Sequence, residues 1–101
     1  MAFNISGNPI TCDSTSVNDF NDALVEMNWD KQFIEVATVS WQNAITAGDV
    51  FILNNSYGEP VVSAICENPN EPFYIPVNGS IHGLVLVELD SGNIAVYQKG
   101  K

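Results

Sequence analysis

The sequence predicts a mainly β protein, a small antiparallel β-sandwich or barrel of about 6–8 strands with one short N-terminal helix. From residue 40 onward, loop segments rich in Gly, Pro and Asn alternate with short segments rich in Val, Ile, Phe and Tyr. A strand every ~8–12 residues, with turn signals between, is typical of such folds. Hydrophobic residues make up 46% of the 101 residues, enough for one modest core, so we expect a single domain over residues 1–101.

The N-terminal segment, residues 1–32, differs in pattern from the β core expected over residues 33–99. Residues 1–12 favour a short strand and a turn. After them, apolar residues recur at spacings of 3 and 4, which places them on one face of a helix that Ser16 is suited to cap. These apolar residues are Val17, Phe20, Leu24 and Met27.

Six apolar segments are expected to be the strands of the core. They cover residues 32–41, 50–54, 61–66, 73–77, 81–89 and 94–98. Neither face of the first is cleanly apolar, so we expect that strand to be bulged or covered on both sides. Pro76 cannot donate to a sheet ladder and predicts an edge strand, whereas Gly83 predicts a bulge or a close backbone approach.

Alternation assigns the two faces of segment 81–89. Val85, Val87 and Leu89 form a wholly apolar side and are expected to face the core. Leu84 and Leu86 would then lie on the outer face. An apolar outer face on a small domain indicates contact with a partner or with copies of the same chain.

Asp90 and Ser91 place an acid beside a hydroxyl at the end of this segment. A nucleophilic serine needs a base within hydrogen-bond reach and an oxyanion hole, and His82 is the only imidazole in the chain. We expect His82 to be a surface or packing residue. We therefore interpret the DSGN stretch as a tight hairpin that joins the last two strands, closed by Asp90 with Gly92 at positive φ. In the final strand, Ile94 and Val96 are expected to be buried, with Tyr97 on the other face.

Charge excludes several classes of partner. The chain has 12 acidic residues against 3 basic ones and a net charge of −9. It cannot assemble the basic patch that nucleic-acid binding requires, and an anionic membrane surface would repel it. The first ten residues have neither a basic region nor a long apolar run, so no signal peptide is expected. No stretch approaches the ~18 apolar residues of a membrane span.

The reactive residue types indicate no enzyme, no cofactor and no metal site. Cys12, Cys66 and His82 lack the spacing of a zinc site, and the acidic residues form no calcium-binding loop. The glycines form no phosphate-binding loop. Without a secretion signal, the two cysteines are expected to be reduced thiols.

Two stretches together resemble a class of small bacteriophage proteins of about this length: WQNAITAGDVFILNNSYGEPV (41–61) and IHGLVLVELDSGNIAVY (81–97). Their shared pattern has a Trp that ends an early strand and then a T-x-A-G-D turn. A strand, a D-x-x-G-type hairpin and a further strand follow, and the pattern ends with G-L, L-D-S-G and V-Y. The resemblance covers about residues 33–98 and leaves residues 1–32 outside it. The residues that carry it are Trp41, Gly48, Asp49, Gly58, Gly83, Leu84, Asp90, Ser91, Gly92, Val96 and Tyr97.

The resemblance implies a non-enzymatic virion structural protein, made in the host cytoplasm. The first hypothesis is a capsid decoration or cement subunit that binds the major capsid protein or other virion proteins and self-associates on the particle. The candidate interface residues are Tyr57, Phe73, Tyr74, Leu84, Leu86 and Tyr97. The candidate structural turn residues are Gly48, Asp49, Gly58, Gly83, Asp90 and Gly92.

Two alternatives stay open. One is a head–tail connector or tail component that forms a ring. The other is a carbohydrate-binding module used in adsorption, with an aromatic platform drawn from Trp29, Trp41, Tyr57, Tyr74 and Tyr97.

Overall fold

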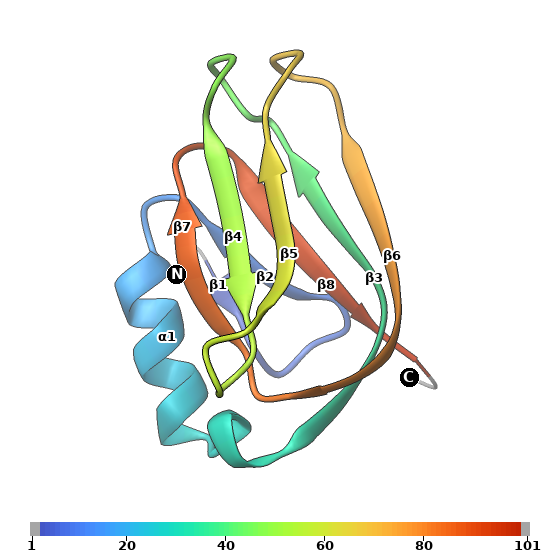
Figure 1. Ribbon diagram of the computed structural model, residues 1–101. Helices are drawn as coiled ribbons and strands as arrows, with labels where there is room; N and C mark the ends of the chain where they lie inside the picture. The colour runs from blue at the N-terminus through green and yellow to red at the C-terminus, as the bar shows by residue number, and fades with distance from the viewer. Residues whose placement is uncertain (1–2, 100–101) are drawn as a thin grey trace.

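The computed structural model describes residues 3–99 and is mainly β, as predicted (Figure 1). The described residues form eight strands, one α-helix and one short 3-10 helix. In chain order, the elements are β1 (Phe3–Asn4), β2 (Ile10–Asp13), α1 (Val17–Glu26), η1 (Trp29–Lys31), β3 (Phe33–Gln42), β4 (Val50–Asn54), β5 (Pro60–Ile65), β6 (Phe73–His82), β7 (Val85–Leu89) and β8 (Asn93–Gln98).

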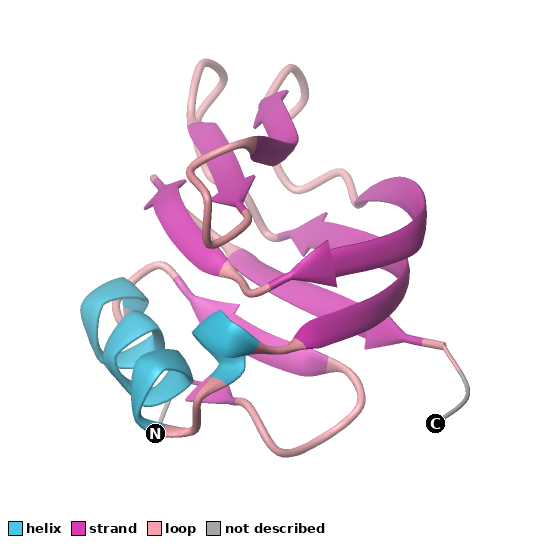
Figure 2. Ribbon diagram, turned by 60° about the horizontal axis from the view of Figure 1, so that its bottom comes forward, coloured by secondary structure: helices cyan, strands magenta, loops and turns pink. Residues whose placement is uncertain are grey.

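The strands form two antiparallel sheets that face each other as a sandwich. The larger sheet has the order β1-β2-β8-β3-β6, and the smaller has the order β5-β4-β7. Their inner faces enclose one hydrophobic core, to which the N-terminal segment contributes Ile10, Cys12 and Phe20. Figure 2 shows the two sheets as layers, with α1 at one side of them.

The chain crosses from one sheet to the other at two places where a continuous strand or a hairpin was predicted. Segment 81–89 is split at Gly83, since β6 belongs to the larger sheet and β7 to the smaller. Gly83 has a φ of 78°, and its N–H donates to the Gln32 carbonyl at 2.9 Å. The predicted hairpin at Asp90–Gly92 is also wrong, because β7 pairs with β4 whereas β8 pairs with β2 and β3.

β6 is longer than predicted and lies at the edge of the larger sheet. It runs through residues 78–80, which lie between two separate strands in the sequence prediction. There the register with β3 shifts between Val36 and Thr38, and Asn78 takes a φ of 50°, so a bulge replaces the loop. The edge position that Pro76 predicted is confirmed. β3 is bulged as its mixed faces indicated, because one extra β3 residue lies between the two pairs that it forms with β8, Val36 with Gln98 and Thr38 with Tyr97.

The predicted faces of β7 are wrong for four of the five residues assigned. Leu84 and Leu86 are buried, whereas Val85 and Val87 are exposed; only Leu89 is buried as predicted. The cause is a register shift against β4, in which Leu53 pairs with Leu86 and Phe51 with Leu89. Leu86 and Leu89 are three positions apart on β7, whereas their partners on β4 are only two positions apart. β7 therefore has one extra residue here, and Val87 bulges outward. Alternation within β7 alone cannot reveal this.

Helix α1 covers the β7 edge of the smaller sheet (Figure 1). It begins after Ser16, as predicted, and buries Phe20 and Leu24, although Met27 is exposed. The Asn21 side chain donates to the Leu86 carbonyl at 2.8 Å and accepts from the Leu86 N–H at 2.9 Å. A side-chain amide thus pairs with the β7 backbone as a neighbouring strand would.

We expect Asn21→Ala to lower the free energy of unfolding by about 1–3 kcal/mol, because it leaves a part-buried backbone N–H and C=O without their partners. Asn18→Ala, at an exposed position on the same helix, is the matched control and should cost less than about 0.5 kcal/mol. Urea unfolding of both variants checks this. Equal losses would show that Asn21 contributes only through helix propensity.

Candidate functional site

The outer face of the larger sheet brings together residues from four strands. Its position follows from the register, because Val39 and Val96 point into the core and their strand neighbours therefore point outward. Two adjacent rows cross this face. They consist of Thr11, Ala95, Ser40 and Tyr74, and of Tyr97, Thr38 and Pro76.

These two rows carry no charged side chain, in a chain whose net charge is −9. Tyr74 and Tyr97 are 59% and 38% exposed, and the smaller Ser40 between them is buried. The Gln42 side-chain amide donates to the Tyr74 hydroxyl at 3.2 Å, which fixes the ring at the β6 edge. Tyrosine with small polar neighbours supplies contact area at low entropic cost, as in protein-binding surfaces. We call these two rows the tyrosine face.

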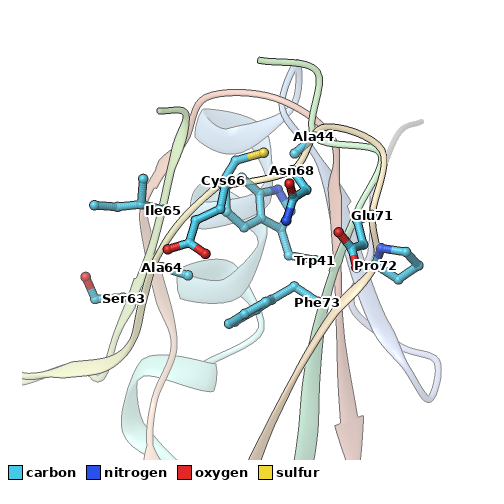
Figure 3. A pocket seen from close by; sticks show the side chains of 11 residues that line it. Trp41, Ala44, Ser63, Ala64, Ile65, Cys66, Asn68, Glu71, Pro72 and Phe73 are labelled. Carbon is cyan, nitrogen blue, oxygen red and sulfur yellow. The ribbon is translucent and has the colours of Figure 1, made fainter. Parts of the chain in front are cut away.

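A groove of about 530 Å³ opens on the other side of β6, between the two sheets (Figure 3). Trp41 and Phe73 line it from the larger sheet, and Ala64 and Ile65 from the smaller. The loop 66–72, which joins β5 to β6, closes one end of the groove and contributes two acidic residues, Glu67 and Glu71. Its volume lies in the range of sites that hold a small ligand or a peptide side chain.

Trp41 forms the buried wall of this groove. It is 3% exposed, and its indole N–H donates to the Ser91 carbonyl at 2.9 Å. Its ring lies 5.7 Å from that of Phe51 in the core. Trp41 is thus not part of an exposed sugar-binding platform, whereas Phe73 is about half exposed and projects into the groove (Figure 3).

Asp90 and Ser91 serve as structural links at the crossing between β7 and β8. The Ser91 hydroxyl donates to Asp49 at 2.5 Å and accepts from the Ile45 N–H at 2.9 Å. Asp90 accepts from the Val50 N–H at 2.8 Å. The crossing is therefore tied to the turn before β4, and both partners of the suspected acid–hydroxyl pair are used in it.

Gly92 has the positive φ expected of it, and three other predicted turn glycines share this backbone conformation. Gly48, Gly58, Gly83 and Gly92 all have positive φ. Asp49 accepts from the Thr46 N–H at 3.3 Å and so closes the turn that contains Gly48. These positions fix the architecture, and none of them lines the groove.

His82 lies in an aromatic cluster at the opposite end of the sandwich from the groove. Its ring stacks on Tyr57 with 4.9 Å between centroids and meets the Phe33 ring edge-on at the same distance. The Ser56 hydroxyl lies 2.7 Å from both the His82 Nδ1 and the His82 carbonyl, and the Ser56 N–H donates to the same carbonyl at 2.9 Å. The hydroxyl proton has the carbonyl as its acceptor, so Ser56 fastens the β4–β5 loop to the end of β6.

Among the described residues, three groups have shifted pKa values. Burial, with a smaller effect of the nearby Asp13 carboxylate, raises the pKa of Cys12 to about 12. A hydrogen bond from the Thr15 side chain lowers the pKa of Asp13. A hydrogen bond with Asp90, together with that residue's charge, raises the pKa of Glu88. The Cys12 thiol is thus held in its unreactive protonated form, and both cysteines are free and buried.

The Cys12 shift predicts a loss of stability at alkaline pH. Above its ordinary pKa of 9.0 the unfolded chain releases the thiol proton, while the folded chain keeps it up to a pH of about 12. The free energy of unfolding should therefore fall as the pH rises through this window. Urea unfolding at about pH 8 and about pH 10 should show a smaller fall for Cys12→Ala than for the natural chain. An identical fall in both would contradict the assignment.

Four of the six predicted interface residues are exposed, and they occupy three separate places. Tyr74 and Tyr97 lie on the tyrosine face, Phe73 lines the groove, and Tyr57 belongs to the aromatic cluster. Leu84 and Leu86 are core residues, so their assignment to an exposed interface is wrong. Sequence reasoning missed Phe33, which is 71% exposed. Phe33 and the charged Glu35 alternate onto the same face of the strand, and this pattern in the sequence could have indicated that Phe33 is exposed.

Comparison with known proteins found no matching family model, no matching curated protein and no matching solved structure. Neither helix in the described part of the chain has the length and apolar character to span a membrane. The side chains that the structure describes include no group of three or more His, Cys, Asp or Glu placed to hold a metal ion.

Proposed function

We propose that this chain is a non-enzymatic structural subunit of a bacteriophage particle, a capsid decoration protein that binds the outer shell through the tyrosine face. The observation that carries the proposal is an uncharged, tyrosine-bearing sheet face on a strongly acidic chain. Charge repulsion between copies is weakest where such faces meet a neighbour, so this face suits both shell binding and contact between adjacent copies. The resemblance of residues 33–98 to small phage proteins supports the particle as its setting.

The residues that carry this resemblance have architectural roles in the fold. Trp41, Asp49 and Ser91 are joined by hydrogen bonds at the β7–β8 crossing. Gly83 and Gly92 sit at two of the four places where the chain changes sheets, between β6 and β7 and between β7 and β8. These roles agree with a non-catalytic protein that acts through its shape and its surface. Many copies on one particle would combine weak individual contacts into firm attachment.

The test is co-sedimentation of the purified chain with shells of the encoding phage that lack it. We expect Tyr74→Ser combined with Tyr97→Ser to weaken shell binding at least about tenfold, because tyrosines at the centre of an interface contribute most of its binding energy. The melting temperature should change little, since both rings are exposed. Tyr57→Ser, an exposed tyrosine at the other end of the sandwich, is the control and should bind normally.

Two results would favour the alternatives. A closed hexamer or dodecamer of the free chain in native mass measurement would favour a ring-forming connector or tail component. A specific glycan bound by the natural chain and lost in the Tyr74 variant would favour carbohydrate adsorption, because Tyr74 and Tyr97 also suit sugar stacking. A natural chain that is monomeric and does not bind shells would refute the decoration role.

A further inference from the structure

The two sheets of the sandwich differ in width, and another element covers only one of the two edges of the narrower sheet. The larger sheet has five strands and the smaller has three. On the β7 side, α1 covers the missing position, and Asn21 pairs with the Leu86 backbone. On the β5 side, no described strand pairs with the outer edge of β5, and the groove lies there.

The groove has the position that a fourth strand of the smaller sheet would take. Its floor is formed by Trp41 and Phe73 of the larger sheet, and its side wall by β5 from Ser63 to Ile65. β5 pairs only with β4 among the described strands, so its outer edge presents backbone groups that the ladder does not use. Its only proline, Pro60, is its first residue. β6 is the poorer acceptor, because Pro76 lies in mid-strand and has no N–H.

Charge at the closed end of the groove indicates what kind of strand would enter. Glu67 and Glu71 line this end, next to the exposed Phe73 ring. A guanidinium or ammonium group there would meet two carboxylates and an aromatic face, while its aliphatic stem covers the apolar wall. The chain's net charge of −9 favours the approach of a basic segment over an acidic one.

We propose that the groove accepts an extended basic segment of a partner protein, which adds to the smaller sheet beside β5. The alternate side chains that point inward would be small or apolar and would cover Trp41 and Phe73. A Lys or Arg at the end of the segment would lie between Glu67 and Glu71. The inference rests on the docking role proposed above and names the chemistry of the partner; the tyrosine face is a separate surface on the other side of β6.

The test uses the whole isolated chain and a synthetic probe, so it does not depend on shells. The probe is the blocked peptide Arg-Val-Thr-Val-Ser-Arg, matched in length to the 6 residues of β5, and its acidic counterpart Glu-Val-Thr-Val-Ser-Glu. We expect the basic peptide to shift the amide resonances of residues 61–65 and Phe73, and to bind more weakly as salt is added. The acidic peptide should bind at least about tenfold more weakly.

Two variants and one modified probe separate strand addition from general charge attraction. Glu67→Gln with Glu71→Gln should weaken the basic peptide about three- to tenfold. Asp22→Asn with Glu26→Gln removes the same charge from exposed positions of α1 and should weaken it less than about twofold. N-methylation of alternate peptide amides on the edge that faces β5 should abolish binding, because it removes the donors of the added ladder.

The inference is overturned if the basic peptide causes no shifts along β5, if the acidic peptide binds equally well, or if N-methylation has no effect. Shifts confined to Tyr74 and Tyr97 would also overturn it. Shell binding that persists while every peptide fails would remove the groove assignment and leave the decoration role intact. Peptide binding by a chain that never binds shells would refute the decoration role and keep the groove as a strand acceptor.

Discussion

Replacement of Gly92 by alanine is expected to lower the free energy of unfolding by more than about 3 kcal/mol. Gly92 has a φ of 78°, a conformation that costs other residues about 1–2 kcal/mol. A Cβ at this position would also lie 2.3 Å from the Gln42 carbonyl oxygen and 2.9 Å from the Ala44 nitrogen. Both are backbone atoms, one in the last residue of β3 and one in the segment that follows it, so relief of the clash would require the β7–β8 crossing to move.

Gly58→Ala is the matched control for this experiment. Gly58 has a similar φ of 84°, but a Cβ there would have no atom within 4 Å. It should therefore show the conformational cost alone, about 1–2 kcal/mol. Urea unfolding of both variants measures the difference, which reports the close approach at Gly92. Equal losses would mean that the crossing is not tightly packed against the end of β3.

Leu86→Ala is expected to lower the free energy of unfolding by about 2–5 kcal/mol, whereas Val87→Ala should cost less than about 1 kcal/mol. Leu86 is 1% exposed and pairs with the buried Leu53, while the adjacent Val87 is 50% exposed. Truncation of Leu86 leaves a cavity between the sheets, and truncation of Val87 removes surface already in contact with water.

This pair of variants decides which face of β7 belongs to the core. Simple alternation predicts that Val87 is the costly position and Leu86 the tolerant one, the reverse of the structure. Equilibrium unfolding of the two variants under the same conditions is sufficient. A larger loss for Val87→Ala would show that the bulge against β4 is absent and would return Leu86 to the surface.

Features encoded locally could be predicted from the sequence. The spacing of Val17, Phe20 and Leu24 lies within one segment and identified α1. The missing N–H of Pro76 is a property of a single residue, and it identified an edge strand. Turn residues that separate apolar segments identified most of the strands, because backbone preference and hydrophobic pattern agree there.

Features that depend on a partner strand could not be predicted in this way. The bulge at Val87 is set by the register with β4, so alternation within β7 gave the wrong faces. The change of sheet at Gly83 and at residues 90–92 depends on which strands pair, and local turn chemistry is compatible with a hairpin or a crossing. The interface prediction failed at Leu84 and Leu86 for the same reason.

The candidate surfaces also combine features encoded locally with features that depend on how the strands pair. Tyr74 and Tyr97 were predicted to be available for contact, and both are exposed, but only the register of three strands places them on one face. The groove requires Trp41 to meet β5 and Phe73, and Trp41 is distant from both in the sequence. No single segment of the sequence indicates that the sheets differ in width or that the outer edge of β5 can accept another strand.

A reconstruction of the encoding phage particle at side-chain detail tests the central claim most directly. The decoration role predicts this chain on the outer shell, with Tyr74 and Tyr97 against the shell protein or a neighbouring copy. A particle in which the chain is absent, or in which the tyrosine face points to solvent and another surface makes the contact, would contradict it.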